Sequence, residues 1–219
     1  MKPLAWSFTS LDCFKNCPFQ YHAKYVLKAV KEEPTEAMPW GTRVHKDFED
    51  RLAVNTPLPV DLRQHEWFMK KLADLPGVAF TEQKIALDKK AQPTHFFDKD
   101  VWYRGVIDYQ KVSDHHATIV DYKTGKPHQK FPQLGMFAIH TFAHFPAVNF
   151  VDAQFYWTQT GGITQKVWGR KDIPAMWQYV LPDLKQYAEA FKTDVWQKRQ
   201  SGLCRKHCAV MSCEHNGRR

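Results

Sequence analysis

The stretch from Gly105 to Lys126 constrains the fold of this chain more than any other part of the sequence. Residues 101–112 are rich in β-branched and aromatic side chains, and residues 117–122 are apolar again after a short polar segment. Two adjacent antiparallel strands joined by a turn are the simplest structure for that pattern. The sequence therefore predicts a β-hairpin near the middle of the chain.

The predicted hairpin carries two acids and a lysine. Side chains alternate across a strand, so Asp121 and Lys123 are expected on one face of the sheet and Tyr122 on the other. With Asp108 on the partner strand, the acids can hold a divalent cation beside an ammonium group, which suits hydrolysis of a phosphodiester. An Asp-x-Lys spacing also occurs on solvated sheet faces without any chemical role. The surrounding sequence has to decide between the two interpretations.

The elements predicted around the hairpin alternate between helices and strands, which is the pattern of one α/β (α+β) domain with a central sheet. Residues 28–38 are expected to form an exposed loop. The other expected elements are two short helices meeting near Cys17 and Pro18, a helix from Trp40 to about Ala53, a helix capped by Asp61 and reaching about Ala73, a strand over 77–88, a helix containing Gln133, strands over 148–158 and 163–168, and a long helix from Lys171 to about Gln200, bent at Pro182.

The length and net charge of the chain limit the number of domains and the kinds of partner that it can have. A chain of 219 residues fits one domain. Its net charge of +8 and its eight tryptophans suit a surface that binds a polyanion and stacks on bases. No segment has the length and apolarity of a membrane span, and the N-terminal residues lack the pattern of a signal peptide. We therefore expect a cytoplasmic protein that binds no membrane.

Five cysteines in a protein expected inside the cell indicate thiols or a metal site rather than disulfides. Cys204, Cys208 and Cys213 fall close together in a polar segment that is too small to fold by burial. A tetrahedral metal site needs a fourth ligand, for which the candidates are Cys13, Cys17, His207 and His215. The alternative is three free thiols at the surface.

Several motifs, taken in order, resemble the RecB-type nucleases of the PD-(D/E)xK superfamily. The spacing from Asp108 to Asp121 (121 − 108 = 13 residues) is also one that this family uses. The resemblance is to small single-domain members, such as phage recombination exonucleases and CRISPR-adaptation nucleases. The residues that carry it are Ser7, Ser10, Phe14, Cys17-Pro18, Tyr21 and Tyr25, then Gly41, His45 and Glu49, then Gly105-x-Ile107-Asp108, then Asp121 to Lys126, then Gln133-Leu134.

The resemblance implies a restriction-endonuclease-like core with a central mixed β-sheet flanked by helices. It implies one nuclease domain over residues 1–219. Within it, residues 1–60 form a helical N-terminal part that carries His45, residues 77–170 form the core sheet, and residues 202–215 form a cysteine cluster.

The resemblance also implies a role for each residue of the site. His45, Asp108, Asp121 and the backbone carbonyl of Tyr122 would ligate Mg²⁺ or Mn²⁺. Lys123 would orient the attacking water or stabilise the charge that develops on the phosphate, and Gln133 would position the nucleophile or a phosphate oxygen. Relatives often have a tyrosine four residues after this glutamine, where this chain has Phe137.

Weaker expectations concern DNA contacts and the cysteines. Arg104 and Lys126 would contact the DNA backbone. Some members of the family hold a [4Fe-4S] cluster, and Cys17, Cys204, Cys208 and Cys213 resemble its ligands; zinc or no metal are the alternatives. The terminal cysteines here are separated by three and then four residues, where the family usually has two and then five.

Together these features predict a metal-dependent deoxyribonuclease, in particular a DNA exonuclease or end-processing nuclease. It would act in recombination, repair or phage DNA metabolism, in a bacterial cell or a phage-infected host. A recombination protein or a single-strand-binding protein could be its partner. The alternative is a catalytically silent module that binds DNA ends or a recombination partner. Action on RNA is not distinguished by sequence.

Overall fold

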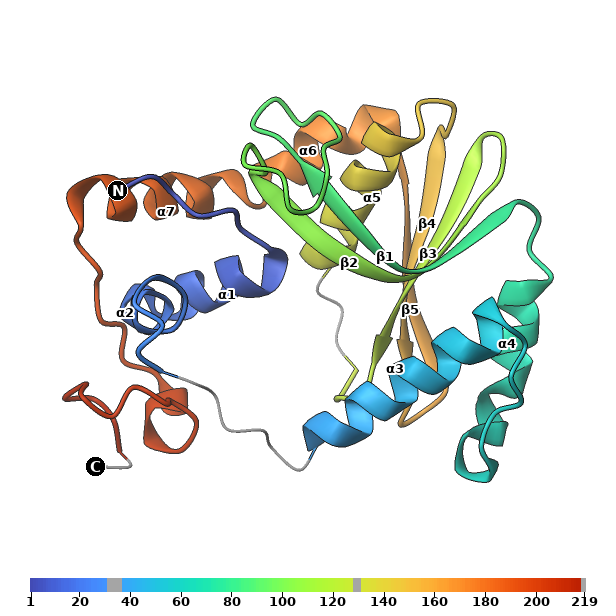
Figure 1. The fold of residues 1–219 in the computed structure, drawn as a ribbon, viewed down its shortest axis with the longest axis horizontal. Coiled ribbons are helices and arrows are strands. Elements are labelled where there is room, and N and C mark those ends of the chain that lie inside the picture. The colour runs from blue at the N-terminus through green and yellow to red at the C-terminus, as the bar shows by residue number, and fades with distance from the viewer. Residues whose placement is uncertain (31–36, 128–130, 218–219) are drawn as a thin grey trace. The chain divides into compact units, whose positions relative to one another are not determined.

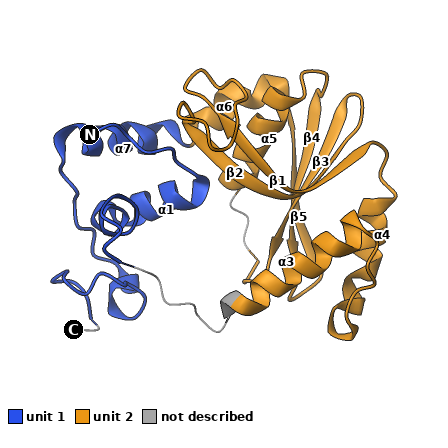
Figure 2. Ribbon diagram, in the orientation of Figure 1, with its two compact units in different colours: residues 1–33, 180–219 blue, residues 34–179 orange. Residues whose placement is uncertain are grey.

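The structure is a computed structural model that describes residues 1–30, 37–127 and 131–217. Its contacts divide the chain into two compact units: unit 1 is Met1–Glu33 with Val180–Arg219, and unit 2 is Pro34–Tyr179 (Figure 2). The expectation of one nuclease domain over the whole chain stays a prediction. Most of the loop expected over residues 28–38 lies outside the described residues. In the described part of the chain, every helix is too short or too polar to cross a membrane.

Unit 2 is built on a five-stranded sheet in the order β1-β2-β3-β4-β5. Only the β3–β4 pair is parallel, and the other neighbours are antiparallel, so the sheet is mixed as expected. β2 and β3 form the predicted hairpin, and β4 and β5 form a second hairpin around Gly161 and Gly162. The strands are β1 (Val78–Leu87), β2 (Tyr103–Val112), β3 (His116–Lys123), β4 (Phe150–Trp157) and β5 (Gly162–Gly169).

Helices cover both faces of the sheet (Figure 1). Two neighbouring residues of β2 show which helix covers which face. The Tyr109 hydroxyl donates to the carbonyl of Leu72 at 2.9 Å on one face, and the Gln110 side chain accepts from Thr141 at 2.7 Å on the other. Leu72 belongs to α4 and Thr141 to α5. The helices of unit 2 are α3 (Ala37–Ala53), α4 (Glu66–Ala73), α5 (Pro132–His144) and α6 (Ile173–Gln178).

The core beneath α3 and α4 fixes the helix that carries His45. Phe48 and Tyr156 are fully buried there, and the Phe48 ring meets the Tyr122 ring edge to face at a centroid distance of 4.9 Å. This confirms that Tyr122 points away from the face that holds Asp121. Burial of a phenylalanine of this kind contributes about 1.5–3 kcal/mol. The same apolar cluster contains Val44, Leu58, Leu62, Phe68, Met69, Leu72, Tyr109 and Val120.

A buried histidine lies in α5, on the other side of the sheet. His140 is fully buried and its ring lies 4.5 Å from the ring of Tyr103. Among the described residues, neither ring nitrogen of His140 has a hydrogen-bonding partner. Burial, followed by the charge of His144, places the pKa of His140 well below its ordinary value of 6.5.

His140 should therefore make the protein sensitive to acid. Below pH 6.5 the unfolded chain binds a proton that the folded chain does not bind, so the free energy of unfolding falls as the pH falls. The slope from one such group is at most about 1.4 kcal/mol per pH unit. We expect His140→Leu to reduce this slope, measured by urea unfolding above and below pH 6.5. Equal slopes in the two proteins would contradict the assignment.

Unit 1 brings together the first and last segments of the chain. Helix α1 (Phe8–Asn16) begins with a capping box, in which the Ser7 amide donates to the Ser10 hydroxyl at 2.9 Å and the Ser10 amide donates to Ser7 at 3.2 Å. The expected break at Pro18 is present, and α2 (Pro18–Tyr21) and a π-helical turn (His22–Val26) follow it. Tyr21 is buried against α7 (Leu181–Thr193), where its hydroxyl lies 2.7 Å from that of Tyr187.

Two expected helices are different in the structure. The long helix predicted from Lys171 to Gln200 is wrong: it is broken between Gln178 and Leu181, because Pro182 lacks an amide hydrogen and is confined to the first turn of α7. It ends at Thr193, where Asp194 adopts a left-handed conformation with φ of 57°. Asp61 does not cap the third helix, since a 3₁₀ segment (Val60–His65) precedes α4.

Candidate active site

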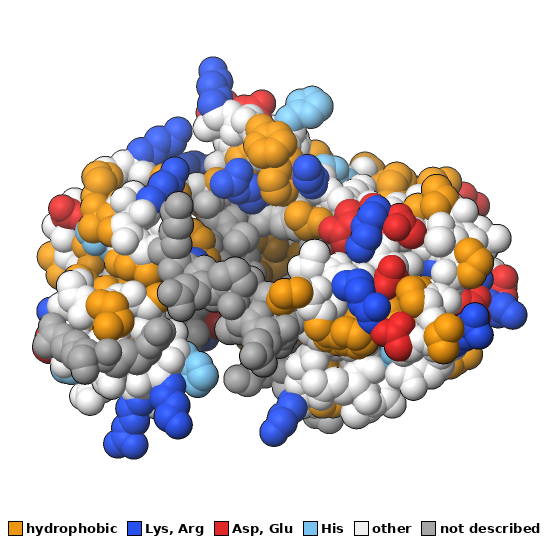
Figure 3. Space-filling view, turned by 60° about the horizontal axis from the view of Figure 1, so that its bottom comes forward, with side chains coloured by type: hydrophobic (Ala, Val, Ile, Leu, Met, Phe, Trp, Pro, Cys, Tyr) orange, Lys and Arg blue, Asp and Glu red, His pale blue; other side chains and the backbone are white. Residues whose placement is uncertain are grey.

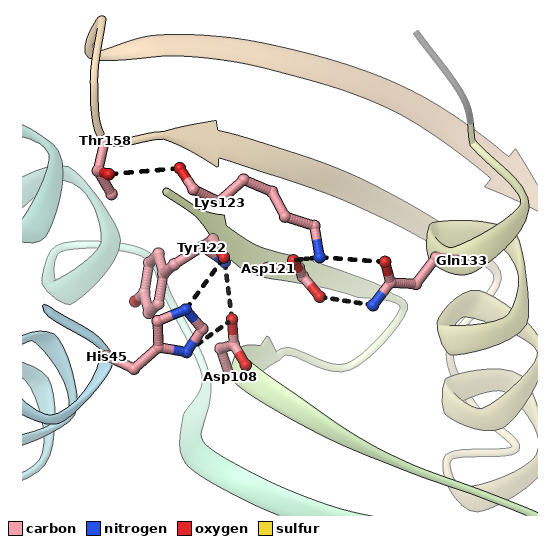
Figure 4. Close-up of polar contacts among 7 residues, drawn as sticks. All are labelled: His45, Asp108, Asp121, Tyr122, Lys123, Gln133 and Thr158. Atoms are coloured by element: carbon pink, nitrogen blue, oxygen red, sulfur yellow. Dashed lines mark hydrogen bonds and ion pairs between the residues drawn. The ribbon is translucent and has the colours of Figure 1, made fainter. Parts of the chain in front are cut away.

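The site begins where β2 and β3 separate. Their backbone pairing runs from Val112 and Ala117 to Tyr109 and Val120 and then stops. Beyond that point the Asp108 carboxylate enters the gap, and its Oδ2 accepts the backbone N–H of Tyr122 at 2.7 Å (Figure 4). Asp108 is therefore fixed to β3 by its side chain rather than by its backbone.

His45 reaches the same place from α3. Its Nε2 lies 3.1 Å from the carbonyl oxygen of Tyr122, and its Nδ1 lies 3.5 Å from Oδ2 of Asp108 (Figure 4). A backbone carbonyl, an imidazole nitrogen and a carboxylate thus converge from three elements. The structure brings together three of the four groups expected to bind a metal.

Asp121, Lys123 and Gln133 form a second cluster beside the first. The Lys123 ammonium lies 2.6 Å from Oδ2 of Asp121 and donates to Oε1 of Gln133 at 3.1 Å. Gln133, in the first turn of α5, donates to Oδ1 of Asp121 at 2.9 Å (Figure 4). The end of β3 is held by Thr158, whose backbone amide and hydroxyl both donate to the Lys123 carbonyl. As expected from strand alternation, Asp121 and Lys123 share one face.

Glu82 was missed by the sequence reasoning and is the third acid of the site. It lies on β1 between the pairs Thr81–Tyr109 and Gln83–Ile107, which places it opposite Asp108. Its φ of 45° is in the left-handed region, which costs a non-glycine residue roughly 1–3 kcal/mol. The ligand atoms of His45, Glu82 and Asp108 lie within 4.8 Å of one another, and among the described residues no other three such side chains do so.

Burial and the repulsion between the negative charges of the acids shift pKa values within the site. Burial, and then repulsion from Asp108, raises the pKa of the Asp121 carboxyl well above its usual range, although Lys123 opposes this. Burial and the charge of Asp108 also raise the pKa of Glu82. Burial tends to lower the pKa of His45, but the hydrogen bond and charge of Asp108 outweigh it, so the net shift is upward. A bound cation would relieve this excess of negative charge.

A cleft of about 480 Å³ opens at His45 and Glu82, and Glu49 also lines it. Glu49, which shares a helix face with His45, pairs with Lys46 at 3.1 Å. The described geometry therefore groups His45 with Glu82 rather than with Glu49.

Replacing Glu82 should weaken metal binding. We expect Glu82→Gln to lower the affinity for Mn²⁺ about 10- to 100-fold, because it removes one charged oxygen ligand while keeping the side-chain shape. Isothermal titration calorimetry with Mn²⁺ measures this. Glu49→Gln is the matched control, since it removes the same charge from the same cleft and should change the affinity less than about threefold. A larger effect at Glu49 than at Glu82 would reverse the assignment.

Lys126 and Arg104, the two residues predicted to contact the DNA backbone, lie in different surroundings. Lys126 is exposed, three residues after Lys123. Arg104 lies four residues before Asp108 on β2, roughly 13 Å along the strand, and its guanidinium lies 5.4 Å from the centre of the Phe96 ring. On the face in Figure 3, Lys and Arg side chains are spread out and partly mixed with Asp and Glu. The net charge is not gathered into one stripe on that face.

The four expected cysteine ligands gather in unit 1. Cys17, Cys204, Cys208 and Cys213 line one small cavity of about 20 Å³, and none of them forms a disulfide. Burial raises the pKa of the Cys208 thiol, and the charges of the other three add to the rise. In a tetrahedral zinc site the sulfurs would lie about 3.8 Å apart. Among the described residues no three of these sulfurs lie within 4.8 Å of one another.

Phe137 stands where nucleases of the RecB type often have a tyrosine. Its ring lies so close to β2 that glycine is the residue that fits at position 105 without displacing it. Phe137 is buried, and a Cβ added to Gly105 would come within 3.1 Å of its ring. That distance is shorter than an ordinary van der Waals contact, so the neighbouring ring would have to shift. Gly105 therefore allows β2 to pass close to α5 three residues before Asp108.

The solved structures that are similar to this chain include two that differ in their degree of similarity. A candidate exonuclease from Eubacterium rectale has a TM-score of 0.57 at 14% identity, over 93% of this chain and 88% of its own. At that identity the similarity shows the fold alone. SSO0001 has a TM-score of 0.45 at 12% identity, over 99% of this chain and 89% of its own, and so low a score supports no conclusion.

Comparison by sequence gives the family. No curated protein matches this chain. The profile of the PD-(D/E)XK nuclease superfamily matches residues 5–213, which include all the acids and Lys123 of the site. The mixed sheet flanked by helices is consistent with the restriction-endonuclease-like fold of that superfamily. The chain belongs to the PD-(D/E)XK nuclease superfamily.

Proposed function

We propose that this protein is a RecB-type deoxyribonuclease that uses Mg²⁺ or Mn²⁺ and digests or processes DNA ends. The observation that supports it most is the contact of Lys123 with both Asp121 and Gln133, next to the converging atoms of His45, Asp108 and Tyr122. A structural ion pair on a sheet face would need neither the glutamine nor the histidine. Their presence beside the acids supports a metal-dependent reaction at a phosphate.

The donor atoms fit a small divalent cation. Carboxylate and carbonyl oxygens suit magnesium, and one imidazole nitrogen makes manganese a good substitute. His45, Asp108, Asp121 and the Tyr122 carbonyl would hold the metal, with Glu82 as a further ligand. The metal would supply Lewis acidity and a water of lowered pKa.

The protein's own side chains then orient the reaction. The Lys123 ammonium, held by Gln133 and Asp121, would face the phosphate and stabilise the negative charge that develops on it. Gln133 keeps the lysine and Asp121 in a fixed arrangement, which reduces the reorganisation needed when the phosphate reacts. Lys126 would contact the DNA backbone nearby, and Arg104 would contact it farther along β2.

A nuclease assay on linear and circular DNA, labelled at the 5′ or the 3′ end, tests the proposal. With Mg²⁺ or Mn²⁺ the protein should shorten linear DNA and spare closed circles, and Lys123→Ala should abolish this activity. The same assay with linear RNA tests whether the substrate is DNA rather than RNA. Tight DNA binding without cleavage under either metal would instead favour a silent module that binds DNA ends.

We propose in addition that Cys17, Cys204, Cys208 and Cys213 bind a [4Fe-4S] cluster that joins the two ends of the chain within unit 1. Four thiols around one cavity support a shared metal centre, and the likeness of their order in the chain to that of cluster-binding members of the family favours the cluster over a single zinc ion. Anaerobically purified protein should contain iron and acid-labile sulfide and absorb visible light, and Cys208→Ser should lose all three. Stoichiometric zinc, or neither metal, would contradict the cluster.

The setting of the reaction is also part of the proposal. A DNA-end nuclease of this size would act in recombination, repair or phage DNA metabolism in the cytoplasm of a bacterium or of a phage-infected cell. A recombination protein or a single-strand-binding protein would be its partner. Co-purification with such a protein on DNA ends would test this.

A further inference from the structure

Unit 2 contains an aromatic pocket that the proposed chemistry does not use. It lies between α5, β5 and α6 and has a volume of about 250 Å³. Trp168 and Met176 form its buried floor, while Tyr179 is 64% exposed at its edge together with Phe131 and Lys166. The pocket is slightly smaller than the roughly 300–1,000 Å³ of drug-sized sites, so it suits one planar ring system.

A glycine inside a helix keeps this pocket open. Gly135 is buried in the first half of α5, where glycine costs about 0.5–1 kcal/mol relative to alanine. A Cβ there would contact the Trp168 ring and the Met176 sulfur, both at 3.7 Å. A longer side chain would project into the space in front of these two residues. The glycine therefore leaves the space above this floor open.

The pocket combines flat rings with one positive charge. The Lys166 ammonium lies 5.3 Å from the centre of the Trp168 ring and 5.8 Å from that of Phe131. The two rings themselves meet edge to face at 6.3 Å and 78°. Lys166 is exposed, so its ammonium is available to an anion outside the pocket. An aromatic surface beside an exposed ammonium suits a base that carries a phosphate.

The pocket is also next to the candidate active site. Phe131 and Gly135 lie two residues before and two residues after Gln133, at the start of α5. Residues two apart on a helix point to opposite sides, so the distance between the two sites is set by the sheet. Asp121 pairs with Phe155 and Lys166 pairs with Ala153, which places Lys166 two strands and two positions from Asp121, roughly 12 Å away. A strand whose phosphate lies at Lys123 and Gln133 would have a nucleotide one or two positions away within reach of the pocket.

We propose that this pocket receives one unpaired nucleobase of the DNA strand that is cut, stacked on the exposed Tyr179 ring above the Trp168 floor, with Lys166 contacting the phosphate of that nucleotide. This inference rests on the proposed function and names its substrate class as DNA with a single-stranded or frayed end. A base inside an intact duplex cannot reach the pocket without leaving its stack.

Binding of a short oligodeoxyadenylate, compared with the same strand bearing one abasic site moved position by position, tests this in EDTA. One position should bind about tenfold more weakly when abasic, because stacking contributes about 1–3 kcal/mol per base. Tyr179→Ala and Gly135→Leu should lose this preference for the base, and Lys166→Gln should weaken binding of both strands. Gly135→Leu keeps the tyrosine ring and fills the pocket, so it tests the pocket independently of Tyr179→Ala.

Lys71→Gln is the matched control, since it removes the same charge from an exposed position of α4. It should leave the preference for the base unchanged. Equal affinity for all abasic strands, or an undiminished preference in Gly135→Leu, would overturn the proposal and assign the pocket to another occupant. If the base preference is present but no metal supports cleavage, the proposed function fails while binding of a base by the pocket stands.

Discussion

Asp121→Asn is expected to reduce DNA cleavage at least about a thousandfold while the protein stays folded. Loss of a carboxylate that is proposed to hold the metal should remove several kcal/mol of transition-state stabilisation, and about 4 kcal/mol corresponds to three powers of ten in rate. Asparagine keeps the shape of the side chain and the oxygen that accepts from Gln133. Single-turnover cleavage of labelled linear DNA with Mn²⁺ is the measurement.

The same variant should be more stable than the natural protein in metal-free buffer. A carboxyl whose pKa is raised by burial and by Asp108 favours the protonated form in the folded state. Its ionised form therefore destabilises the fold once the pH rises above the unfolded value of 3.8, and the effect grows until the folded group has ionised. Asparagine cannot ionise, so the thermal midpoint of Asp121→Asn at neutral pH should lie above that of the natural protein.

Asp152→Asn is the control for both measurements. Asp152 is an aspartate on the adjacent strand β4 that accepts a hydrogen bond from a glutamine, Gln154, at 2.8 Å, as Asp121 does from Gln133. Its replacement should leave cleavage within about threefold. Cleavage by Asp121→Asn within tenfold of the natural protein would refute the role of Asp121.

Phe48→Ala should cost about 3–5 kcal/mol of the free energy of unfolding, because it leaves a cavity between α3 and the sheet. Phe48 has no exposed surface, and its ring contacts those of Tyr122 at 4.9 Å and His65 at 5.5 Å. It lies three residues after His45 on the same helix. The truncation should therefore also weaken Mn²⁺ binding, since α3 would no longer hold the imidazole against the Tyr122 carbonyl.

Urea unfolding and Mn²⁺ titration of the same preparations measure the two effects of Phe48→Ala. Trp67→Ala is the comparison: it removes a larger aromatic ring from α4, but this ring is 51% exposed, so the loss should stay below about 1 kcal/mol. A loss below 1 kcal/mol at Phe48 would show that α3 is held by other contacts.

The elements that the sequence predicts well are those whose periodicity is local. The β2–β3 and β4–β5 hairpins follow from alternating apolar residues around turns, and α5 follows from its helical spacing. The prediction of one long helix failed because the helix breaks before Pro182 and ends at the left-handed Asp194, and the spacing of side chains alone does not reveal this.

Glu82 shows why the site could be predicted only in part. Asp121 and Lys123 are two residues apart, so strand geometry fixes their relation. Glu82 meets Asp108 only through the register of β1 against β2, and that register depends on the whole sheet. An acid within the strand preceding the hairpin was the available signal, but it has no fixed spacing to the other acids.

Unit 1, made from both ends of the chain, has a consequence for synthesis on the ribosome. Roughly 150 residues separate its two segments, which at about 5–20 residues per second is roughly 7–30 s of translation. During that time Phe14 and Tyr21 have no α7 to cover them, whereas unit 2 is continuous and can fold as it emerges. The unit that bears the acids would be complete before the unit that bears the cysteines could close.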